Sequence, residues 1–357
     1  MPVTGERMMI SKRDAKMSQG LAILSMVMLH LFCRDDTSLY NVHLFAGGVP
    51  LLYYIALFGD ICVPIYCFSS GYAQYVLVNR EGNSYRISRL KRLFSFVCHY
   101  WIVVCIFSVI GSVAGDADIP GNIQTFVGNL FLFRQTYNGA WWFVITYIFL
   151  ILLSPLAIKA VDHTKPPITV LCSGVVYVLS YVLYYVWPIS VEGYIQSWIL
   201  EQLLLLGRCQ FPFVIGMEFC NLKVMDYMRR ILNSNVKRKC FIVIIPLACF
   251  LFHCVIQSMF VAPFTATMTL ISFHLWDKPL WLEKTLLFFG KYSTNIWLTH
   301  MFFYLTLFKG FVFAFKEPIL IYVVMLLICI AISYAINYVE KAVKCGLSMA
   351  VQFIKRR

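Results

Sequence analysis

Two histidines stand inside long apolar stretches of the chain, and an imidazole can exchange protons near neutral pH. His30 ends the stretch QGLAILSMVMLH, which begins at Gln19, and His300 ends LLFFGKYSTNIWLTH, which begins at Leu286. An ionisable side chain is costly to place inside a bilayer, so it often marks a functional site. The two histidines therefore suggest acid–base chemistry within a membrane. Hydrogen bonding between helices is the alternative for both.

The composition of the 357-residue chain is that of a helical membrane protein. Hydrophobic residues make up 60% of it and charged residues only 13%, with a mean hydropathy of +0.75, whereas about a quarter of a soluble protein is charged. In a membrane protein, the net charge of +13 indicates basic cytoplasmic loops and not nucleic-acid binding. The first 16 residues are polar and basic, so no cleavable signal peptide is expected.

Apolar runs of 18 or more residues recur along the chain and predict an all-α transmembrane bundle, because each such run is long enough to cross about 30 Å of hydrocarbon. We expect ten spans, at residues 17–34, 53–78, 93–115, 139–158, 168–187, 199–220, 240–259, 261–276, 286–308 and 318–340. Only Ala262-Pro263 separates the seventh and eighth spans, which could form a broken pair or a re-entrant hairpin. Residues 117–138 are predicted to form an extracytoplasmic interfacial segment.

The distribution of basic residues predicts the orientation of the bundle. With the N-terminus in the cytoplasm, 24 Lys and Arg residues fall on the cytoplasmic side and 4 on the other side. The positive-inside rule then places both termini in the cytoplasm of a multi-pass protein of the inner or plasma membrane. We divide the chain into a cytoplasmic tail (residues 1–16), one transmembrane domain (17–340) and a basic cytoplasmic tail (341–357).

Two arginines at the cytoplasmic start of the third span could bind phosphate. Arg89 and Arg92 are three residues apart, so they share one face of a helix. Paired guanidinium groups suit bidentate phosphate contacts. The alternative is that anionic lipid headgroups satisfy them, as they do in many basic loops.

Other polar residues interrupt the apolar spans. In the second span, Ser70 and Gly71 permit either a close helix approach or a local break. Asp60 is expected near the outer interface, where a charge is solvated. In the sixth span, Glu201 and Arg208 are seven residues apart and could pair with other helices.

Aromatic residues and metal-binding residue types carry less information. Trp141 and Trp142 open the fourth span, where an aromatic belt at the membrane interface is the ordinary explanation. The 13 cysteines and 7 histidines show no metal-ligand spacing, so no metal site is predicted.

Taken in order, these motifs resemble the acyltransferase-3 family of integral membrane acyltransferases. The family pattern of a basic residue, ten residues and His corresponds to Gln19 and His30 here. The further matching elements are Ser70-Gly71-Tyr72, the pair Arg89 and Arg92, AWWFVITYIFLILLSPL (140–156), FPFVIGM (211–217) and FFGKYSTNIWLTH (288–300).

The resemblance implies transfer of an acyl group, usually acetyl, from cytoplasmic acyl-CoA to a hydroxyl of a lipid-linked or surface glycan. It gives His30 the catalytic role, and it places Arg89 and Arg92 where they would contact the phosphates of CoA. The family's basic residue is Gln19 in this chain, and Lys16, one turn earlier, could substitute for it. The other candidate pocket residues are Asp60, Ser70, Tyr72, Trp142, Glu201, Arg208, Lys291, Ser293 and His300.

The expected partners are membrane lipid, the glycan acceptor and proteins of polysaccharide biosynthesis. Two other classes of function stay open on the same scaffold. One is a glycan or lipid transporter, and the other is a non-catalytic subunit of a polysaccharide synthase. Acyl-CoA binding would separate the enzyme from both.

Overall fold

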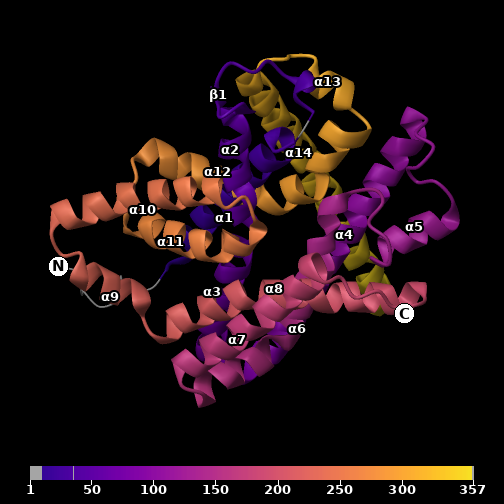
Figure 1. The fold of residues 1–357 in the computed structure, drawn as a ribbon. Helices are drawn as coiled ribbons and strands as arrows, with labels where there is room; N and C mark the ends of the chain where they lie inside the picture. The colour runs from indigo at the N-terminus through magenta and orange to yellow at the C-terminus, as the bar shows by residue number, and fades with distance from the viewer. Residues whose placement is uncertain (1–9, 35, 356–357) are drawn as a thin grey trace. The chain divides into compact units, whose positions relative to one another are not determined.

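The computed structural model describes residues 10–34 and 36–355, with side chains as far as residue 346 (Figure 1). In the predicted tails, Arg7, Arg356 and Arg357 lie outside these ranges. The long helices are α1 (Lys12–Phe32), α3 (Cys62–Glu81), α4 (Tyr85–Ala114), α6 (Trp142–His163), α7 (Pro166–Tyr181), α8 (Tyr194–Asn221), α10 (Asn235–Val255), α11 (Ala262–Leu275), α12 (Leu280–Met301) and α14 (Pro318–Lys355).

Shorter elements connect the long helices. They are α2 (Leu51–Leu57), α5 (Ile123–Leu130), α9 (Val224–Ile231), α13 (Lys309–Phe313) and an antiparallel pair of two-residue strands, β1 (Phe45–Ala46) and β2 (Val49–Pro50). Single 3₁₀ turns lie at Thr37–Leu39, Phe58–Ile61, Gly82–Ser84, Gly139–Trp141 and Met259–Val261. π-Helical turns at Val182–Val186 and Phe302–Thr306 follow α7 and α12.

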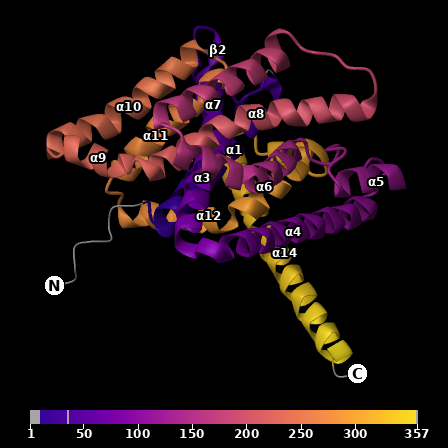
Figure 2. The same ribbon diagram turned by 90° about the horizontal axis from the view of Figure 1, so that it is seen from below.

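Each predicted span falls mainly on helical residues, and the chain is an all-α membrane protein. The second span, 53–78, covers α2, a 3₁₀ turn and α3. Within the described residues, seven segments are long and apolar enough to cross a membrane. One of them, Leu51–Ala114, contains two of the predicted spans. The number of crossings therefore stays a prediction. α14 runs as one helix through residue 340, where we placed the start of the C-terminal tail (Figure 2).

The structure resolves the ambiguity at the seventh and eighth predicted spans. They are two separate helices, α10 and α11, which pack against each other. The chain turns at residues 256–261, and Pro263 lies in the first turn of α11, where its missing N–H breaks no helical hydrogen bond. With 14 residues, α11 rises only about 21 Å and is shorter than the hydrocarbon layer.

The chain forms two compact units, which are described separately below. The first comprises residues 10–34, 42–87 and 144–293, and the second comprises 36–41, 88–143 and 294–355. In the first unit, α3 packs against α8 and α1, and α7 packs against α8 (Figure 1). α1 begins with a capping box, in which the Ser11 hydroxyl accepts from the Asp14 backbone N–H and the Asp14 carboxylate accepts from the Ser11 N–H.

Glycines allow the helices of the first unit to touch backbone to backbone. A Cβ on Gly71 would lie 1.8 Å from the Phe213 carbonyl oxygen, and one on Gly216 would lie 2.1 Å from the Phe68 carbonyl oxygen. α3 runs unbroken through Ser70 and Gly71. Of the two predicted uses of this motif, the structure therefore shows the close approach and not the break.

The second unit is built around buried indoles. Trp141 is fully buried and donates from Nε1 to the Leu298 carbonyl at 3.0 Å, and Trp297 Nε1 donates to the Ala140 carbonyl at 3.1 Å. The aromatic-belt explanation was therefore wrong for Trp141, because its ring packs inside the unit and not at a lipid interface. Trp142 is half-buried and contacts Phe143 edge-on.

We predict that Gly71→Ala destabilises the protein by about 1–3 kcal/mol, because the added methyl would overlap the Phe213 carbonyl. The measurement is unfolding in mixed detergent micelles. Gly310→Ala is the matched control, since a Cβ at Gly310 meets nothing within 4 Å. Equal stability of the two variants would show that α3 and α8 do not depend on this contact.

Candidate functional site

His30 lies in the last turn of α1 and is half-buried. Its carbonyl accepts from Arg34 Nη2 at 2.7 Å, which closes the end of the helix. The 14 residues from Lys16 to His30 correspond to a rise of roughly 21 Å. The His30 imidazole and the Lys16 ammonium therefore belong to opposite ends of α1.

Lys16 reaches Gln19, the position at which the family pattern has a basic residue. Its ammonium nitrogen donates to Gln19 Oε1 at 2.9 Å, so the two side chains share a face of α1 as predicted. The Tyr66 hydroxyl donates to the Gln19 carbonyl at 3.4 Å. The substitution of Lys16 for the family's basic residue stays a prediction, and the contact with Gln19 is compatible with it.

The same end of α1 meets the motif that contains Lys291 and Ser293. A Cβ on Gly290 would lie 2.0 Å from the Lys16 carbonyl oxygen, so α12 crosses α1 backbone to backbone. The Ser293 hydroxyl is buried and donates to the Gly290 carbonyl at 3.0 Å. Lys291 is exposed, with Nζ 5.1 Å from the centroid of the Tyr292 ring. The structure therefore brings Lys16, Gln19 and this motif together.

Asp60 is not solvated as we expected. It is buried, and its Oδ2 lies 3.4 Å from Nε2 of His253, which is only 1% exposed. The preceding Gly59 fits against the Ser25 carbonyl of α1, where a Cβ would lie 2.4 Å away. A carboxylate–imidazole pair therefore lies inside the unit that also contains His30. His253 was missed, although it ends an apolar run in the same way as His30 and His300.

The remaining candidates of the first unit have structural contacts. The Tyr72 hydroxyl accepts from the Ile10 backbone N–H at 3.0 Å, and Ser70 is half-buried on the same helix. Arg208 Nη1 donates to the Tyr185 hydroxyl at 2.7 Å and its guanidinium lies 4.2 Å from the Tyr184 ring centroid. Arg208 therefore contacts the π-helical turn that follows α7, a partner outside its own helix as predicted.

Glu201 lies beside a cavity of the first unit. It lines a cavity of about 210 Å³ whose wall also includes Tyr184 and Ser190. A role of Glu201 in the candidate site stays a prediction.

In the second unit, the paired arginines differ in exposure. Arg89 is buried, with 7% of its surface exposed, whereas Arg92 is exposed near the start of α4. Arg92 can therefore reach a phosphate from solvent directly, and Arg89 offers a charge from inside the unit.

Two turns beyond Arg92, α4 carries a histidine that the sequence gave no reason to single out. His99 Nδ1 lies 3.0 Å from Glu340 Oε2, and its Nε2 lies 2.6 Å from Asn295 Oδ1. The Asn295 amide nitrogen in turn donates to Asn337 Oδ1 at 3.0 Å. Each imidazole nitrogen of His99 thus faces an acceptor, and the network joins α4, α12 and α14.

His300 has a structural role in the second unit. It is fully buried, and its Nδ1 lies 2.8 Å from the Trp297 carbonyl and 3.1 Å from the Ile296 carbonyl of its own helix. Its ring stacks against Tyr304 at a centroid distance of 5.9 Å. The backbone carbonyls fix the tautomer with the proton on Nδ1, and the full burial of the ring keeps it from contact with solvent.

The comparisons with known proteins give one match. The model of the acyltransferase-3 family, described as an acyltransferase domain, matches residues 17–338. Neither the curated proteins nor the solved structures contain a match to the chain.

We predict that Asp60→Ala lowers the free energy of unfolding by about 3 kcal/mol, because it leaves His253 buried without its carboxylate. Arg13→Ala is the matched control. It removes the ion pair to Glu283, whose side chains are 55% and 28% exposed, and such a pair contributes about 0–1 kcal/mol. Unfolding in mixed micelles should separate the two variants, and a smaller loss for Asp60→Ala than for Arg13→Ala would contradict the assignment.

Proposed function

The chain belongs to the acyltransferase-3 family, and we propose that it transfers an acyl group, acetyl by preference, from cytoplasmic acyl-CoA to a hydroxyl of a lipid-linked or surface glycan. One observation carries the proposal: the family match covers residues 17–338, with His30 at the end of α1. The half-buried imidazole is within reach of a substrate, as a general base must be.

In the proposed reaction, the acceptor hydroxyl oxygen attacks the carbonyl carbon of the thioester. A C–O bond forms, the C–S bond breaks, and CoA leaves. His30 accepts the proton of the hydroxyl, and the proton is then delivered to the CoA thiolate, so the products are the glycan ester and CoA thiol. No net proton is released.

We assign the basic residues to the donor. Arg92, which is exposed, and Arg89 would contact the phosphates of CoA. Lys16, in the first unit, is proposed as a further basic residue for the donor. The predicted orientation places all three on the cytoplasmic side, where acyl-CoA is found. The proposed location is the inner or plasma membrane, with both termini in the cytoplasm and with proteins of polysaccharide biosynthesis as partners.

We predict that His30→Ala lowers acetyl transfer or acetyl-CoA hydrolysis by roughly 100- to 10,000-fold, the usual contribution of a general base. The measurement uses the full-length protein in nanodiscs with acetyl-CoA. His163→Ala is the control, because His163 is exposed at the end of α6. Unchanged turnover in His30→Ala would remove His30 from the catalytic role. Failure of the wild type to bind acetyl-CoA would favour a transporter or a synthase subunit.

We also predict that Lys16→Ala lowers turnover at least about tenfold, the loss of one charge-assisted contact. In the double variant Lys16→Ala/Gln19→Arg, turnover should return, because the cation then stands at position 19 itself. Lys12→Ala, a change at an exposed lysine one turn away, should have no effect. A double variant as inactive as the single one would show that Lys16 does not act by supplying charge there.

A further inference from the structure

His99 lies on the same face of α4 as an arginine assigned to the phosphates of CoA. Arg92, Phe96 and His99 recur at intervals of four and three residues, so they follow one stripe along the helix. The Phe96 ring stacks on the Trp297 ring of α12 at a centroid distance of 6.1 Å. The rise from Arg92 to His99 is roughly 10 Å. A contact that fixes the rotation of α4 at His99 therefore also sets the direction in which the Arg92 side chain leaves the helix.

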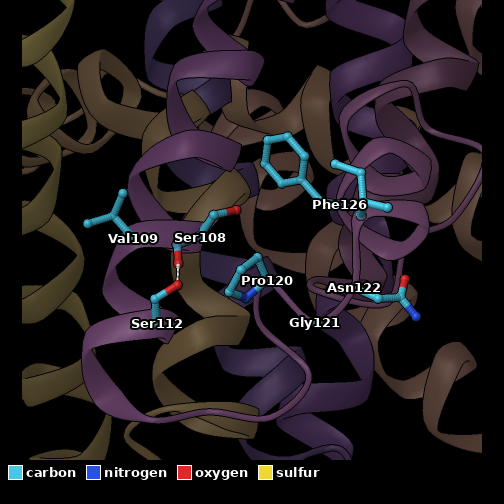
Figure 3. A pocket seen from close by; sticks show the side chains of 8 residues that line it. Ser108, Val109, Ser112, Pro120, Gly121, Asn122 and Phe126 are labelled. Atoms are coloured by element: carbon cyan, nitrogen blue, oxygen red, sulfur yellow. Dashed lines mark hydrogen bonds between the residues drawn. The ribbon is translucent and has the colours of Figure 1, made fainter.

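The serines near the other end of α4 have a different environment. Ser112 donates to the Ser108 carbonyl of its own helix at 2.9 Å (Figure 3). Both serines line a cavity of about 300 Å³, beside Pro120 and Phe126. The Ser112 bond lies within one helix, whereas the bonds of His99 connect α4 to α12 and α14.

The atoms around His99 require it to carry a proton on each ring nitrogen. Glu340 Oε2, 3.0 Å from Nδ1, and Asn295 Oδ1, 2.6 Å from Nε2, are both acceptors. The amide of Asn295 cannot be turned round, because its nitrogen donates to the Ser333 main-chain carbonyl at 3.3 Å and to Asn337 Oδ1 at 3.0 Å. Both nitrogens of His99 therefore donate, and its ring is an imidazolium.

Glu340 balances the charge of this ring. The side chains of His99 and Glu340 are 12% and 19% exposed, so water screens the pair only in part. Lys344 Nζ donates to the other carboxylate oxygen of Glu340 at 2.5 Å, which favours the ionised form. α12 presents the uncharged Asn295, and on α4 the nearest cation in the sequence is Arg92. A neutral His99 would set a lone pair against one of its two acceptors, so loss of the proton breaks the network.

We propose that His99 is a positioning residue for the donor, and that its second ring proton holds α4 to α12 and α14. Through this link it fixes the rotation of α4 and with it the places of Arg89 and Arg92. The assignment of these arginines to the phosphates of CoA rests on the proposed function. CoA is then bound best while His99 is charged, since deprotonation frees α4 to turn.

Glu340→Gln separates the charge of His99 from its contacts. In this variant a neutral ring is fully satisfied, because Nε2 still donates to Asn295 and Nδ1 accepts from the amide that replaces the carboxylate. Nitrogen-15 NMR of the histidine rings in nanodiscs should show two protonated nitrogens in wild-type His99 and one in Glu340→Gln at the same pH. The His99 signals are those absent from His99→Leu. A neutral His99 in the wild type near pH 7 would overturn the inference.

Titration calorimetry with CoA, on the full-length protein in nanodiscs, tests the positioning. His99→Leu should weaken CoA binding about tenfold, as for one lost contact to a charged group, and should raise KM for acetyl-CoA more than it lowers kcat. Glu340→Gln should keep the wild-type affinity near pH 7. As His99 loses its proton at higher pH, the wild type should fall below Glu340→Gln, and the ratio of the two affinities cancels the titration of the phosphates. Lys344→Ala, which leaves the bond from His99 to Glu340 in place, is the control.

Equal CoA affinity in the wild type and His99→Leu would overturn the inference and leave the network a purely structural role. If His99→Leu does not fold, the comparison with Glu340→Gln decides, and identical pH courses of affinity would overturn it. The proposed function fails separately. CoA binding that depends on His99 in a protein that transfers no acyl group supports the inference and removes the reaction. Acyl transfer with an unchanged KM in His99→Leu does the reverse.

Discussion

The fold depends on backbone contact between helices at positions that lack a side chain. Apolar burial gives little drive for helix association in lipid, so close packing must supply it. Gly71 against Phe213 and Gly290 against Lys16 are such contacts, and a methyl group fits at neither. Both glycines belong to motifs that the resemblance associates with function. The glycines of these motifs therefore serve helix packing. The packing in turn positions the polar residues that neighbour each glycine.

A second constraint acts on buried polar groups, because lipid offers them no hydrogen-bond partner. Asp60 meets His253, His99 meets Glu340 and Asn295, and Trp141 meets a main-chain carbonyl. These pairs join helices that are distant in the sequence and fix their rotation about their axes. His300 is satisfied within its own helix. His30, at the end of α1, is instead half-buried.

The sequence predicted the helices well because the length of an apolar run is a local property. It placed Lys16 and Gln19 on one face of the first helix for the same reason, since three residues nearly complete a helical turn, and the two side chains are in contact. Partners across helices could not be predicted, so Asp60 was placed in solvent and Trp141 in a lipid interface. His253 could have been found by the criterion that selected His30. Its pairing with Asp60, like the network of His99, depends on helix rotations that no local pattern encodes.

The exchange of the family's basic residue for Gln19 changes the kind of charge as well as its origin. An arginine offers a rigid fork that binds two oxygens at once, whereas the Lys16 ammonium is a compact charge on a flexible stem. Gln19 restrains that stem by accepting a hydrogen bond from it. The pair can therefore supply attraction for a phosphate but not bidentate geometry. Of the proposed donor contacts, only the guanidinium groups of Arg89 and Arg92 can orient the nucleotide end of acyl-CoA.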